Sequence, residues 1–390
     1  TEFGKQILYN FLFGVCGCKG QWKMEDFVQQ SIEKYREKLS GKKVLLALSG
    51  GVDSSVAALL LKEQGYDVIG VTMQIWDAID STDEAACGGL SEAEDARQVA
   101  EIIGIPHYVV NFSKEFRRDV IDYFISDYLA GRTPNPCIAC NRYIKWEALL
   151  HKAVSLGADY IATGHYGKIT ELPNGRYSVE KSEATGKDQS YVLYNLTQEE
   201  LSHTLFPLSM MEKEDVRKIA LDHNLPVAHK KDSQDICFVK DKDYAGFIER
   251  ETGIKSRPGN FVDSRGNVLG THTGIIHYTI GQRKGLGIAF GEPKYVIRLN
   301  PDTNEVVLGD HDELMTYEVY VDRVNYMSVE SITEPTRVTG KIRYAAKDTP
   351  CTIYPEENGR IKAVFDEAVR AVTPGQAAVF YDGNNIICGG

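Results

Sequence analysis

The chain has no long hydrophobic run, few cysteines and no excess of positive charge. No apolar stretch in its 390 residues approaches the roughly 18 residues needed to span a bilayer, which argues against a membrane-spanning helix. Eight cysteines are too few for a disulfide scaffold. The net charge of −11 has the wrong sign for a protein that coats nucleic acid through its overall field, so any RNA contact must come from local basic clusters.

The N-terminal region also lacks the features of a secretory signal. Residues 8–15 are its most apolar part, but no basic segment precedes them and no small-residue cleavage site follows. We therefore expect a cytoplasmic protein, in a reducing compartment where clustered cysteines indicate metal binding or catalysis. Residues 1–40 are predicted to be a partly helical extension, with apolar residues at helical spacing over 25–39. Cys16 and Cys18 form an isolated CxC there, which we interpret as two ordinary thiols in preference to a metal or sulfur-relay site.

Strand and helix patterns alternate between residues 43 and 165. The predicted strands are 43–48, 67–74, 107–111 and 160–163, and the predicted helices are 54–65, 92–103 and 144–156. This alternation predicts an α/β fold with a parallel sheet, helices on both faces and ligands beyond the carboxyl ends of the strands. From about residue 241, Gly-rich turns between short alternating segments predict all-β structure that ends in a barrel. We predict four parts: an extension (1–40), a catalytic domain (41–240), a small mixed or β central domain (241–313) and a C-terminal β-barrel (314–390).

The sharpest local signal is the sequence SGGVDSS at residues 49–55, between a buried strand and a helix. Gly50 and Gly51 let the backbone turn tightly, so that several N–H groups and the start of the helix can face an anion. The loop adds three hydroxyl donors, Ser49, Ser54 and Ser55. Asp53 is out of place beside phosphates unless it orients the loop or holds Mg²⁺. Because no Gly-Lys-Ser/Thr is present, this is not the P-loop of kinases and GTPases.

Cysteines carry the remaining chemistry, in two segments: residues 131–146 (GRTPNPCIACNRYIKW) and 232–239 (DSQDICFV). In the first segment, two prolines fix a stiff exposed loop ahead of Cys137 and Cys140, which stand at the start of a helix. A thiol at this position, with Arg142 and Lys145 nearby, is expected to have a lowered pKa and to be nucleophilic. Cys237 lies in a short apolar segment after a polar loop.

Residues 49–55 resemble the PP-loop of the ATP pyrophosphatase superfamily, whose members split ATP between the α and β phosphates and adenylate a substrate. The loop alone does not choose among GMP synthetase, asparagine or argininosuccinate synthesis, and tRNA sulfuration. The choice comes from six further segments, which resemble the bacterial tRNA-specific 2-thiouridylase family: 131–141 (GRTPNPxxxCN), 163–166 (TGHY), 187–193 (KDQSYVL), 232–238 (DSQxICF), 278–287 (YTIGQRKGLG) and 373–383 (TPGQAAVFYDG). The similarity runs from about residue 43 to the C-terminus.

The resemblance implies a role for each matching residue. The catalytic residues would be Cys140 as nucleophile, Cys237 as carrier of a persulfide, and Asp53. The ATP-binding residues would be Ala47, Leu48, Ser49, Gly50, Gly51, Val52, Asp53, Ser54, Met73 and Gly164. The tRNA-binding residues would be Asn135, Pro136 and Cys137, which meet the target uridine, together with His165, Lys187, Asp188, Gln189, Arg343, Tyr344 and Gln376.

The resemblance also implies the reaction and its partners. The enzyme would use ATP and Mg²⁺ to activate the C2 oxygen of the wobble uridine, and a persulfide would then supply the sulfur. The tRNA substrates would be those for glutamate, glutamine and lysine. A sulfur-donor protein, such as a cysteine desulfurase or a relay protein, would load the enzyme, which we expect to be a monomer that does not bind membranes.

One departure from the family leaves the sulfur chemistry open. Its best-known members have Asp where this chain has Cys137, so that CxxC replaces DxxC. Three thiols could hold an iron–sulfur cluster with an open fourth site, on Cys137, Cys140 and Cys237. We favour the persulfide route, with Cys137 as a bystander or resolving thiol. A structural zinc site would need a fourth ligand that the sequence does not single out.

Other readings of the chain remain as alternatives. One is a PP-loop sulfurtransferase that acts on a different RNA base through a cluster. Another is a tRNA-binding protein that has lost catalysis, and ATP turnover would separate it from an enzyme. A small-molecule ligase of the amidotransferase type is disfavoured because no glutaminase-like domain is present. Three further cysteines are predicted to be ordinary thiols: Cys87, Cys351 and Cys388.

Overall fold

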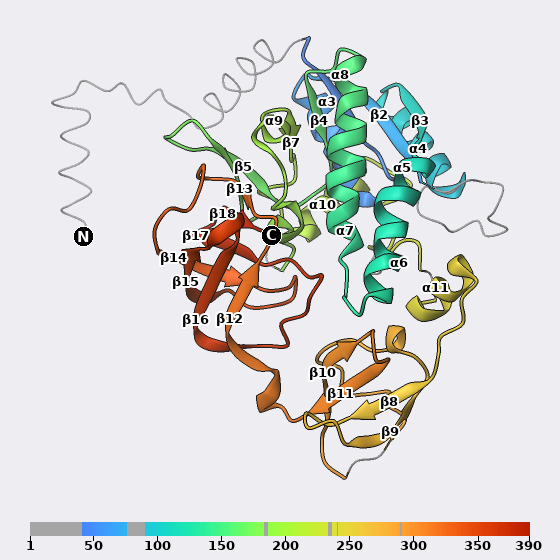
Figure 1. The fold of residues 1–390 in the computed structure, drawn as a ribbon. Coiled ribbons are helices and arrows are strands. Elements are labelled where there is room, and N and C mark those ends of the chain that lie inside the picture. The colour runs from blue at the N-terminus through green and yellow to red at the C-terminus, as the bar shows by residue number, and fades with distance from the viewer. Residues whose placement is uncertain (1–40, 76–89, 183–185, 233–235, 240, 289–290) are drawn as a thin grey trace, which may run out of the picture.

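The computed structural model describes residues 41–390 except 76–89, 183–185, 233–235, 240 and 289–290. The helix expected at 25–39, and Cys16, Cys18 and Cys87, lie outside the described residues. Within them, an α/β part is followed by a small central sheet and a larger C-terminal sheet (Figure 1). None of the described helices is both long and apolar enough to cross a bilayer.

The α/β part is built on a parallel sheet with strand order β3-β2-β1-β4-β7. Its strands are β1 (Lys43–Ala47), β2 (Asp67–Gln74), β3 (His107–Asn111), β4 (Tyr160–Ala162) and β7 (Thr204–Leu205). Alternate residues of a strand point to opposite faces, so Val44 and Leu46 join one apolar core while Leu45 and Ala47 join another. Both faces are therefore buried, which confirms the predicted sheet with helices on its two sides.

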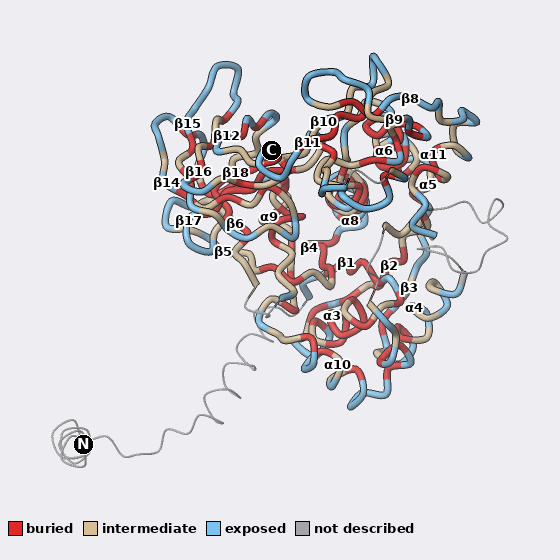
Figure 2. The backbone as a smooth tube through the Cα atoms, turned by 90° about the horizontal axis from the view of Figure 1, so that it is seen from below, coloured by how far each residue is buried: buried red, intermediate tan, exposed pale blue. Residues whose placement is uncertain are grey.

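Helices cover the two faces unequally. One face is packed by α3 (Val52–Glu63), α4 (Leu90–Ile103) and α10 (Lys213–Asp222). The helices whose residues join the opposite core are α5 (Ser113–Phe116), α6 (Asp122–Leu129), α7 (Pro136–Ala139), α8 (Leu149–Ser155) and α9 (Gln198–Ser202). Figure 2 shows buried residues on both sides of the strands.

A continuous helical run joins α7 to α8 and contains a π-helical stretch, Cys140–Ala148. The helix predicted over 144–156 therefore begins earlier than expected. The cause is Asn135, whose side chain accepts hydrogen bonds from the backbone N–H groups of Cys137 and Ile138, and Pro136 follows as the first helical residue. Wide π turns are rare and often mark functional sites. Another such turn, Arg117–Ile121, lies between α5 and α6.

The central sheet has the strand order β10-β11-β8-β9. Its strands are β8 (Gly259–Val262), β9 (Val268–His272), β10 (Tyr295–Asn300) and β11 (Glu305–Gly309). The prediction of all-β structure from about residue 241 was wrong at its start, because α11 (Tyr244–Thr252) is a helix. Asp243 caps this helix by accepting from the Gly246 N–H, and Gly253 ends it in the left-handed conformation.

The C-terminal sheet includes strands from two distant parts of the chain. Its strands are β12 (Met315–Val321), β13 (Asn325–Tyr326), β14 (Thr336–Lys341), β15 (Thr349–Pro355), β16 (Ile361–Arg370), β17 (Val379–Asp382) and β18 (Asn385–Gly389), with β5 (Lys168–Glu171) and β6 (Tyr177–Glu180). The β5–β6 hairpin comes from the α/β part and joins β18, where the Ser178 hydroxyl donates to the Ile386 carbonyl at 2.9 Å. Cys351 and Cys388 are fully buried here, which confirms them as core thiols.

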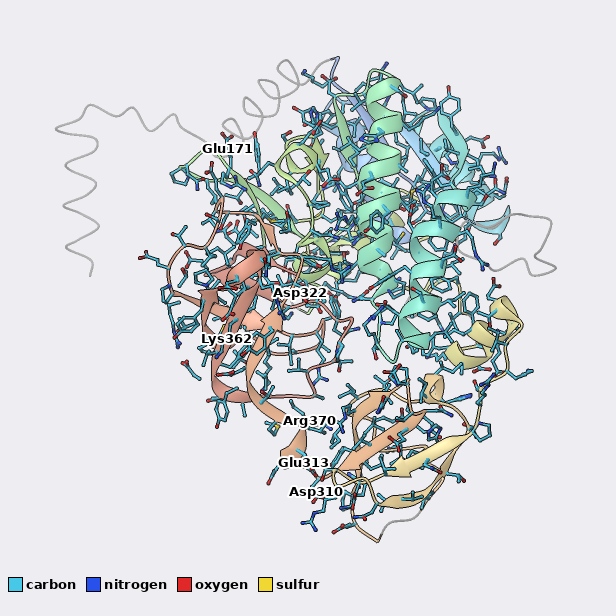
Figure 3. All side chains as sticks on the ribbon, in the orientation of Figure 1. Glu171, Asp310, Glu313, Asp322, Lys362 and Arg370 are labelled. Carbon is cyan, nitrogen blue, oxygen red and sulfur yellow. The ribbon has the colours of Figure 1, made fainter. Side chains whose placement is uncertain are left out.

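Arg370, at the end of β16, ties the C-terminal sheet to the central sheet (Figure 3). Its guanidinium donates to the Gly281 carbonyl at 3.4 Å and lies 5.3 Å from the ring centre of Tyr295. A planar guanidinium over an aromatic ring is a favourable contact between the two sheets.

Candidate active site

A cavity of 570 Å³ lies at the carboxyl ends of β1 and β2. Its walls come from the strand ends, from the start of the helical run at Pro136, from residues 236–238 and from Tyr344 of the C-terminal part. This volume is in the range of small-molecule sites, which is about 300–1,000 Å³. The cavity therefore lies where the sequence predicted a ligand, beyond the carboxyl ends of parallel strands.

The phosphate loop is held in shape by its own hydroxyl groups. The Ser49 N–H donates to Ser54 Oγ at 3.2 Å, and the two hydroxyl oxygens are 3.0 Å apart. Ser55 is fully buried and donates to the Gly51 carbonyl at 2.7 Å, so it shapes the loop and does not face the cavity. Gly50 has φ +68°, and a Cβ there would lie 2.4 Å from the Glu92 carbonyl oxygen. Only glycine fits this position.

The predicted ATP-binding residues separate into a lining set and a supporting set. Those that line the cavity are Ala47, Leu48, Ser49 and Met73. The supporting residues lie in the loop and the first turn of α3: Gly50, Gly51, Val52, Asp53 and Ser54. Gly164 allows the end of β4 to approach this turn, because a Cβ there would lie 2.7 Å from the Ser54 backbone nitrogen.

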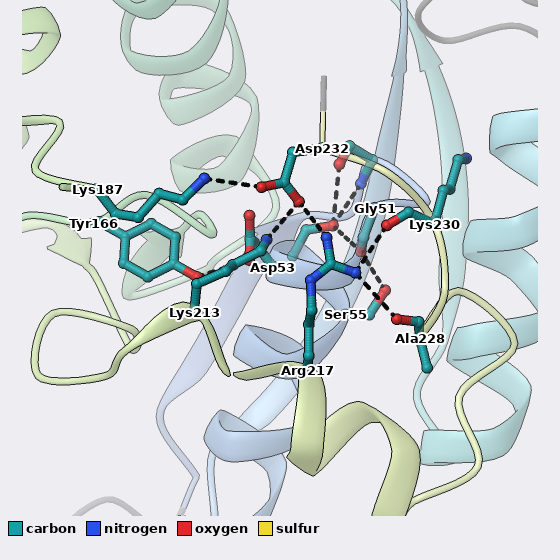
Figure 4. A network of polar contacts seen from close by, with 12 residues as sticks. Gly51, Asp53, Ser55, Tyr166, Lys187, Lys213, Arg217, Ala228, Lys230 and Asp232 are labelled. Carbon is teal, nitrogen blue, oxygen red and sulfur yellow. Dashed lines mark hydrogen bonds and ion pairs between the residues drawn. The ribbon is translucent and has the colours of Figure 1, made fainter. Parts of the chain in front are cut away.

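Two lysines from distant segments bring positive charge to the loop (Figure 4). Lys213, which is buried, places Nζ 2.6 Å from Asp53 Oδ1, and the Tyr166 hydroxyl donates to the same oxygen at 2.8 Å. Lys230 donates to the Gly50 carbonyl at 3.0 Å and pairs with Asp95 at 2.9 Å. Asp53 is therefore held by two side chains from outside the loop, and each lysine places its ammonium group within hydrogen-bond distance of a loop oxygen. Sequence reasoning missed Lys213, because nothing in the pattern of α10 distinguishes it from a surface lysine.

Asp232 lies at the centre of the same network (Figure 4). Its carboxylate is 2.9 Å from Lys213 Nζ, 2.9 Å from Lys187 Nζ and 2.8 Å from the Arg217 guanidinium. Burial favours its protonated form, but the pairs with Lys213 and Lys187 outweigh burial and lower the pKa of Asp232 to about 2. The group is therefore ionised at neutral pH.

The cavity brings together three thiols from segments about a hundred residues apart. Cys137, Cys140 and Cys237 all line it, and none of the three is in a disulfide. Cys137 is exposed, whereas Cys140 and Cys237 are half-buried. Across the described part of the chain, no three His, Cys, Asp or Glu side chains are grouped as a metal-binding set. The thiols share a cavity with the phosphate loop but do not form a ligand set for a cluster.

Of the two basic residues expected beside Cys140, Lys145 lines the cavity and Arg142 does not. Lys145 donates to Asn141 Oδ1 at 2.7 Å, and its Nζ lies 3.4 Å from His165 Nε2. Arg142 pairs with Glu147 at 3.5 Å and lies over the ring of Tyr143. Lys145 is therefore the positive charge on the cavity side of the helix.

Six of the ten predicted tRNA-binding residues line the cavity. Those that line it are Asn135, Pro136, Cys137, His165, Gln189 and Tyr344. Lys187 is paired with Asp232, and the Asp188 carboxylate accepts from Ser190 and from the Ser182 N–H, so Asp188 fixes a turn. The Tyr344 hydroxyl donates to the Asp188 carbonyl at 3.3 Å, which joins the C-terminal part to this turn.

Gln376 and Arg343 come from the C-terminal part. Gln376 donates to the Thr133 carbonyl at 2.8 Å and so fixes the loop ahead of Cys137. Arg343 directly precedes Tyr344, which lines the cavity. The C-terminal part therefore contributes to the site at two places.

We expect His165 to make the protein less stable in acid. Burial, and then the charge of Lys145, hold the pKa of His165 well below its usual value. Below about pH 6.5 the unfolded chain therefore binds a proton that the native ring does not, and stability falls by at most about 1.4 kcal/mol per pH unit. Urea unfolding at about pH 7.5 and about pH 5.5 should show a smaller acid loss for His165→Asn than for the wild type. The exposed His311→Asn is the control, and equal losses in all three proteins would contradict the assignment.

The fold and the cavity define a class: a HUP-type α/β domain whose cavity holds a phosphate loop and cysteines, followed by two β domains. Family models match "tRNA methyl transferase HUP domain" at residues 42–241, "tRNA methyl transferase PRC-barrel domain" at 246–310 and "Aminomethyltransferase beta-barrel domain" at 316–390. The chain belongs to the tRNA-specific 2-thiouridylase family.

Full-length relatives show this membership. The chain is 56% identical to the tRNA-specific 2-thiouridylase MnmA of Lachnoclostridium phytofermentans, over 90% of this chain and 99% of the relative. It is 54% identical to the protein of the same name from Acetivibrio thermocellus, over 90% and 99% of the two chains. Against the Clostridioides difficile protein of that name the identity is 54%, over 90% and 97%.

Proposed function

We propose that this protein uses ATP to replace the C2 oxygen of the wobble uridine in tRNA with sulfur. The observation that carries the proposal is that Cys140 and Cys237 line the same cavity as the phosphate loop. The family models are described by methyl transfer and the relatives by thiolation. A pair of thiols beside a phosphate loop suits sulfur transfer, in which one thiol carries the sulfur and the other releases it.

The first step activates the base. The uridine C2 oxygen attacks the α-phosphorus of ATP, supplied as its Mg²⁺ complex, and pyrophosphate leaves. The glycine turn at Gly50 and Gly51 and the start of α3 would bind the phosphates through backbone N–H groups, while Lys213 and Lys230 would offset negative charge at the loop. The C2 oxygen is a poor leaving group by itself. After this step it can leave as part of AMP.

The second step transfers sulfur. A persulfide on Cys237 attacks C2 with its outer sulfur, and AMP leaves with the original oxygen. The Cys140 thiolate then attacks the inner sulfur of Cys237, the sulfur–sulfur bond breaks, and its electron pair stays on the sulfur now bound to the base. A Cys140–Cys237 disulfide results, and an external thiol reduces it. Lys145 brings a positive charge to the cavity that holds the cysteines.

We also propose the substrates and partners that the resemblance to the family implies. The tRNAs are those for glutamate, glutamine and lysine, and the sulfur comes from a cysteine desulfurase or a relay protein. The need for an external thiol fits a reducing cytoplasm. We expect the enzyme to act as a monomer.

The test combines product analysis with metal analysis. The protein is purified without oxygen and its iron and labile sulfide are measured. It is then incubated with ATP, Mg²⁺, a sulfur donor and unmodified glutamate tRNA, and the digested nucleosides are analysed by mass spectrometry. Appearance of 2-thiouridine only with ATP is the expected result. ATP cleavage with tRNA but without any thiolated base would contradict sulfur transfer.

An iron–sulfur enzyme is the second candidate, because Cys137 lines the cavity beside the other two thiols. Since the three thiols are not grouped as a metal set, we derive no step through a cluster. Cys137→Ser separates the two routes. In the persulfide route this variant keeps activity within about tenfold of wild type, whereas loss of a cluster ligand would cost iron and activity together.

We expect Arg343 to make an electrostatic contact with tRNA. Arg343→Ala should weaken tRNA binding and reduce the slope of log affinity against log salt by about 0.7 to 1. Arg337→Ala is the matched control, because this arginine of β14 is already paired with Asp366 on the exposed side of the sheet. The measurement is a filter-binding titration at several salt concentrations. An unchanged slope for Arg343→Ala would remove this residue from the tRNA interface.

A further inference from the structure

A second cavity, of 350 Å³, lies between the α/β part and the C-terminal sheet. Tyr123 of α6 and Tyr194 line it from the α/β part, and the end of β12 lines it from the other side. Figure 3 labels Asp322, which directly follows β12 and also lines this cavity. The volume is in the range of small-molecule sites. The proposed reaction uses only the cavity that holds the cysteines, so the second cavity has no assigned role.

The second cavity shares a wall with the cavity that holds the cysteines. Asn135 lines both of them. In the C-terminal part, Ile342 lines the second cavity and Tyr344 lines the first, with Arg343 between them in the chain. Because Asn135 borders both cavities, a single RNA strand can place two consecutive nucleotides on the two sides of this wall.

Contacts within the protein hold the loop of this wall in place. The Thr133 N–H donates to the Pro374 carbonyl at 2.8 Å, and Gln376 donates to the Thr133 carbonyl at 2.8 Å. Gly375, with φ +93°, allows this close approach, because a Cβ there would lie 3.0 Å from backbone atoms of Thr133. The C-terminal part therefore fixes the loop that separates the two cavities.

Two arginines bring positive charge to the second cavity. Arg132 donates through Nε to Asp127 at 2.9 Å, and this contact holds its guanidinium at the cavity. The described lining residues include one acidic side chain, Asp322, and Arg360 pairs with it at 2.6 Å. Arg323 therefore leaves the cavity with a net positive charge. A guanidinium binds phosphate oxygens through charge-assisted hydrogen bonds, so this lining favours a phosphate group.

Two tyrosine rings add a surface that suits a nucleobase. Burial raises the pKa of both hydroxyls, to about 12 for Tyr123, and the positive charge of Arg323 opposes the rise at Tyr123 and at Tyr194. Both hydroxyls are therefore protonated at neutral pH, and the guanidinium lies close enough to act on both. Aromatic rings and guanidinium planes are the groups on which unstacked RNA bases stack.

We propose that the second cavity binds the nucleotide next to the target uridine while that uridine occupies the cavity that holds the cysteines. Arg132 and Arg323 bind its phosphate, and Tyr123 and Tyr194 contact its base. The inference rests on the proposed thiolation of tRNA and names a further part of the substrate that the protein recognises. A base that has left its stack loses stacking energy, and contacts to its neighbour offset part of this cost.

The first experiment locates this nucleotide by cross-linking. Glutamate tRNA is assembled with 4-thiouridine in place of the uridine on one side or the other of the wobble position. Each tRNA is bound to the full chain and irradiated, and mass spectrometry identifies the cross-linked residues. We expect one of the two tRNAs to cross-link to Tyr123, Tyr194 or residues 319–323. Absence of a cross-link to these residues from both tRNAs overturns the proposal.

Arg323→Gln tests the contribution of charge. We expect this variant to bind tRNA about fivefold more weakly and to lower the yield of the cross-link at least about threefold. Arg337→Gln is the matched control, because it removes the same charge from an exposed arginine that pairs with Asp366. It should keep both values within about twofold of the wild type. Equal effects of the two substitutions overturn the proposal.

Two further measurements separate the proposal from its alternatives. Free 4-thiouridine monophosphate is another source of the same chemistry. If it cross-links to these residues with the same yield as tRNA, the cavity is a small-molecule site and the proposal is overturned. Nucleoside analysis keeps the two levels of inference apart. Failure to bind and thiolate glutamate tRNA refutes the proposed function, whereas thiolation without the expected cross-link refutes this inference alone.

Discussion

Cys237→Ala is expected to reduce formation of 2-thiouridine at least about a thousandfold while the protein still folds and binds tRNA. The thiol is half-buried in the cavity and is the proposed carrier of the transferred sulfur, so no other group replaces it. Activation of the base precedes sulfur transfer, and one equivalent of pyrophosphate per enzyme should therefore still be released. Nucleoside mass spectrometry and a pyrophosphate assay measure the two steps separately.

Cys140→Ala is the informative partner variant. Without an external thiol, it should lose the product to a similar extent but stop after the outer sulfur of Cys237 has attacked C2, so that tRNA stays covalently attached to Cys237 and is visible as a protein–tRNA adduct on a non-reducing gel. The two variants thus fail at different points of one sequence of steps. Product formation within tenfold of wild type in either variant would contradict the two-cysteine scheme.

Gly50→Ala is expected to weaken ATP binding by about a hundredfold, or about 2.7 kcal/mol. The added Cβ would lie 2.4 Å from the Glu92 carbonyl oxygen, and the backbone there has φ +68°, so the loop must leave its place against α4. Isothermal titration with ATP gives the affinity, and thermal unfolding shows whether the rest of the protein is intact.

Gly51→Ala is the matched control for this prediction. Its Cβ would meet nothing closer than Ser49 Oγ at 3.4 Å, and its backbone is extended, with φ −100°. We expect a loss of less than about fivefold, since no backbone must move. Equal losses of ATP affinity in the two variants would contradict this prediction. They would mean that the glycines matter because they let phosphates approach the backbone, and not because of the backbone conformation of Gly50.

Much of the α/β part could be predicted from the sequence because its strands are short apolar runs that end in turn residues. The expected strands at 67–74 and 107–111 match β2 and β3. The helix α11 was missed although Asp243 and Gly253 mark its ends, because the Gly-rich segments around it suggested β structure throughout. Local patterns therefore sufficed where burial is periodic and failed where one helix stands among strands.

Some residues of the site could also be predicted from the sequence and others could not. The loop at residues 49–55 and the three cavity cysteines belong to recognisable motifs, whereas Lys213 and Asp232 do not. The pair between Lys213 and Asp53 joins residues 160 positions apart. A contact of this kind leaves no periodicity in the sequence, because its energy depends on where the fold brings two charges. Networks of charged side chains that connect separate motifs can therefore be found only in the structure.

The joining of the β5–β6 hairpin to β18 matters for synthesis on the ribosome. Ser178 cannot form its hydrogen bond until Ile386 has been synthesised, 208 residues later in the chain. Because the ribosome adds about 5–20 residues per second, the delay is roughly 10 to 40 seconds. During that time the open edge of β6 presents unpaired N–H and C=O groups, to which another chain can pair. Strand β18 therefore covers the edge of a hairpin made much earlier, and a truncation that removes β18 would leave that edge unpaired.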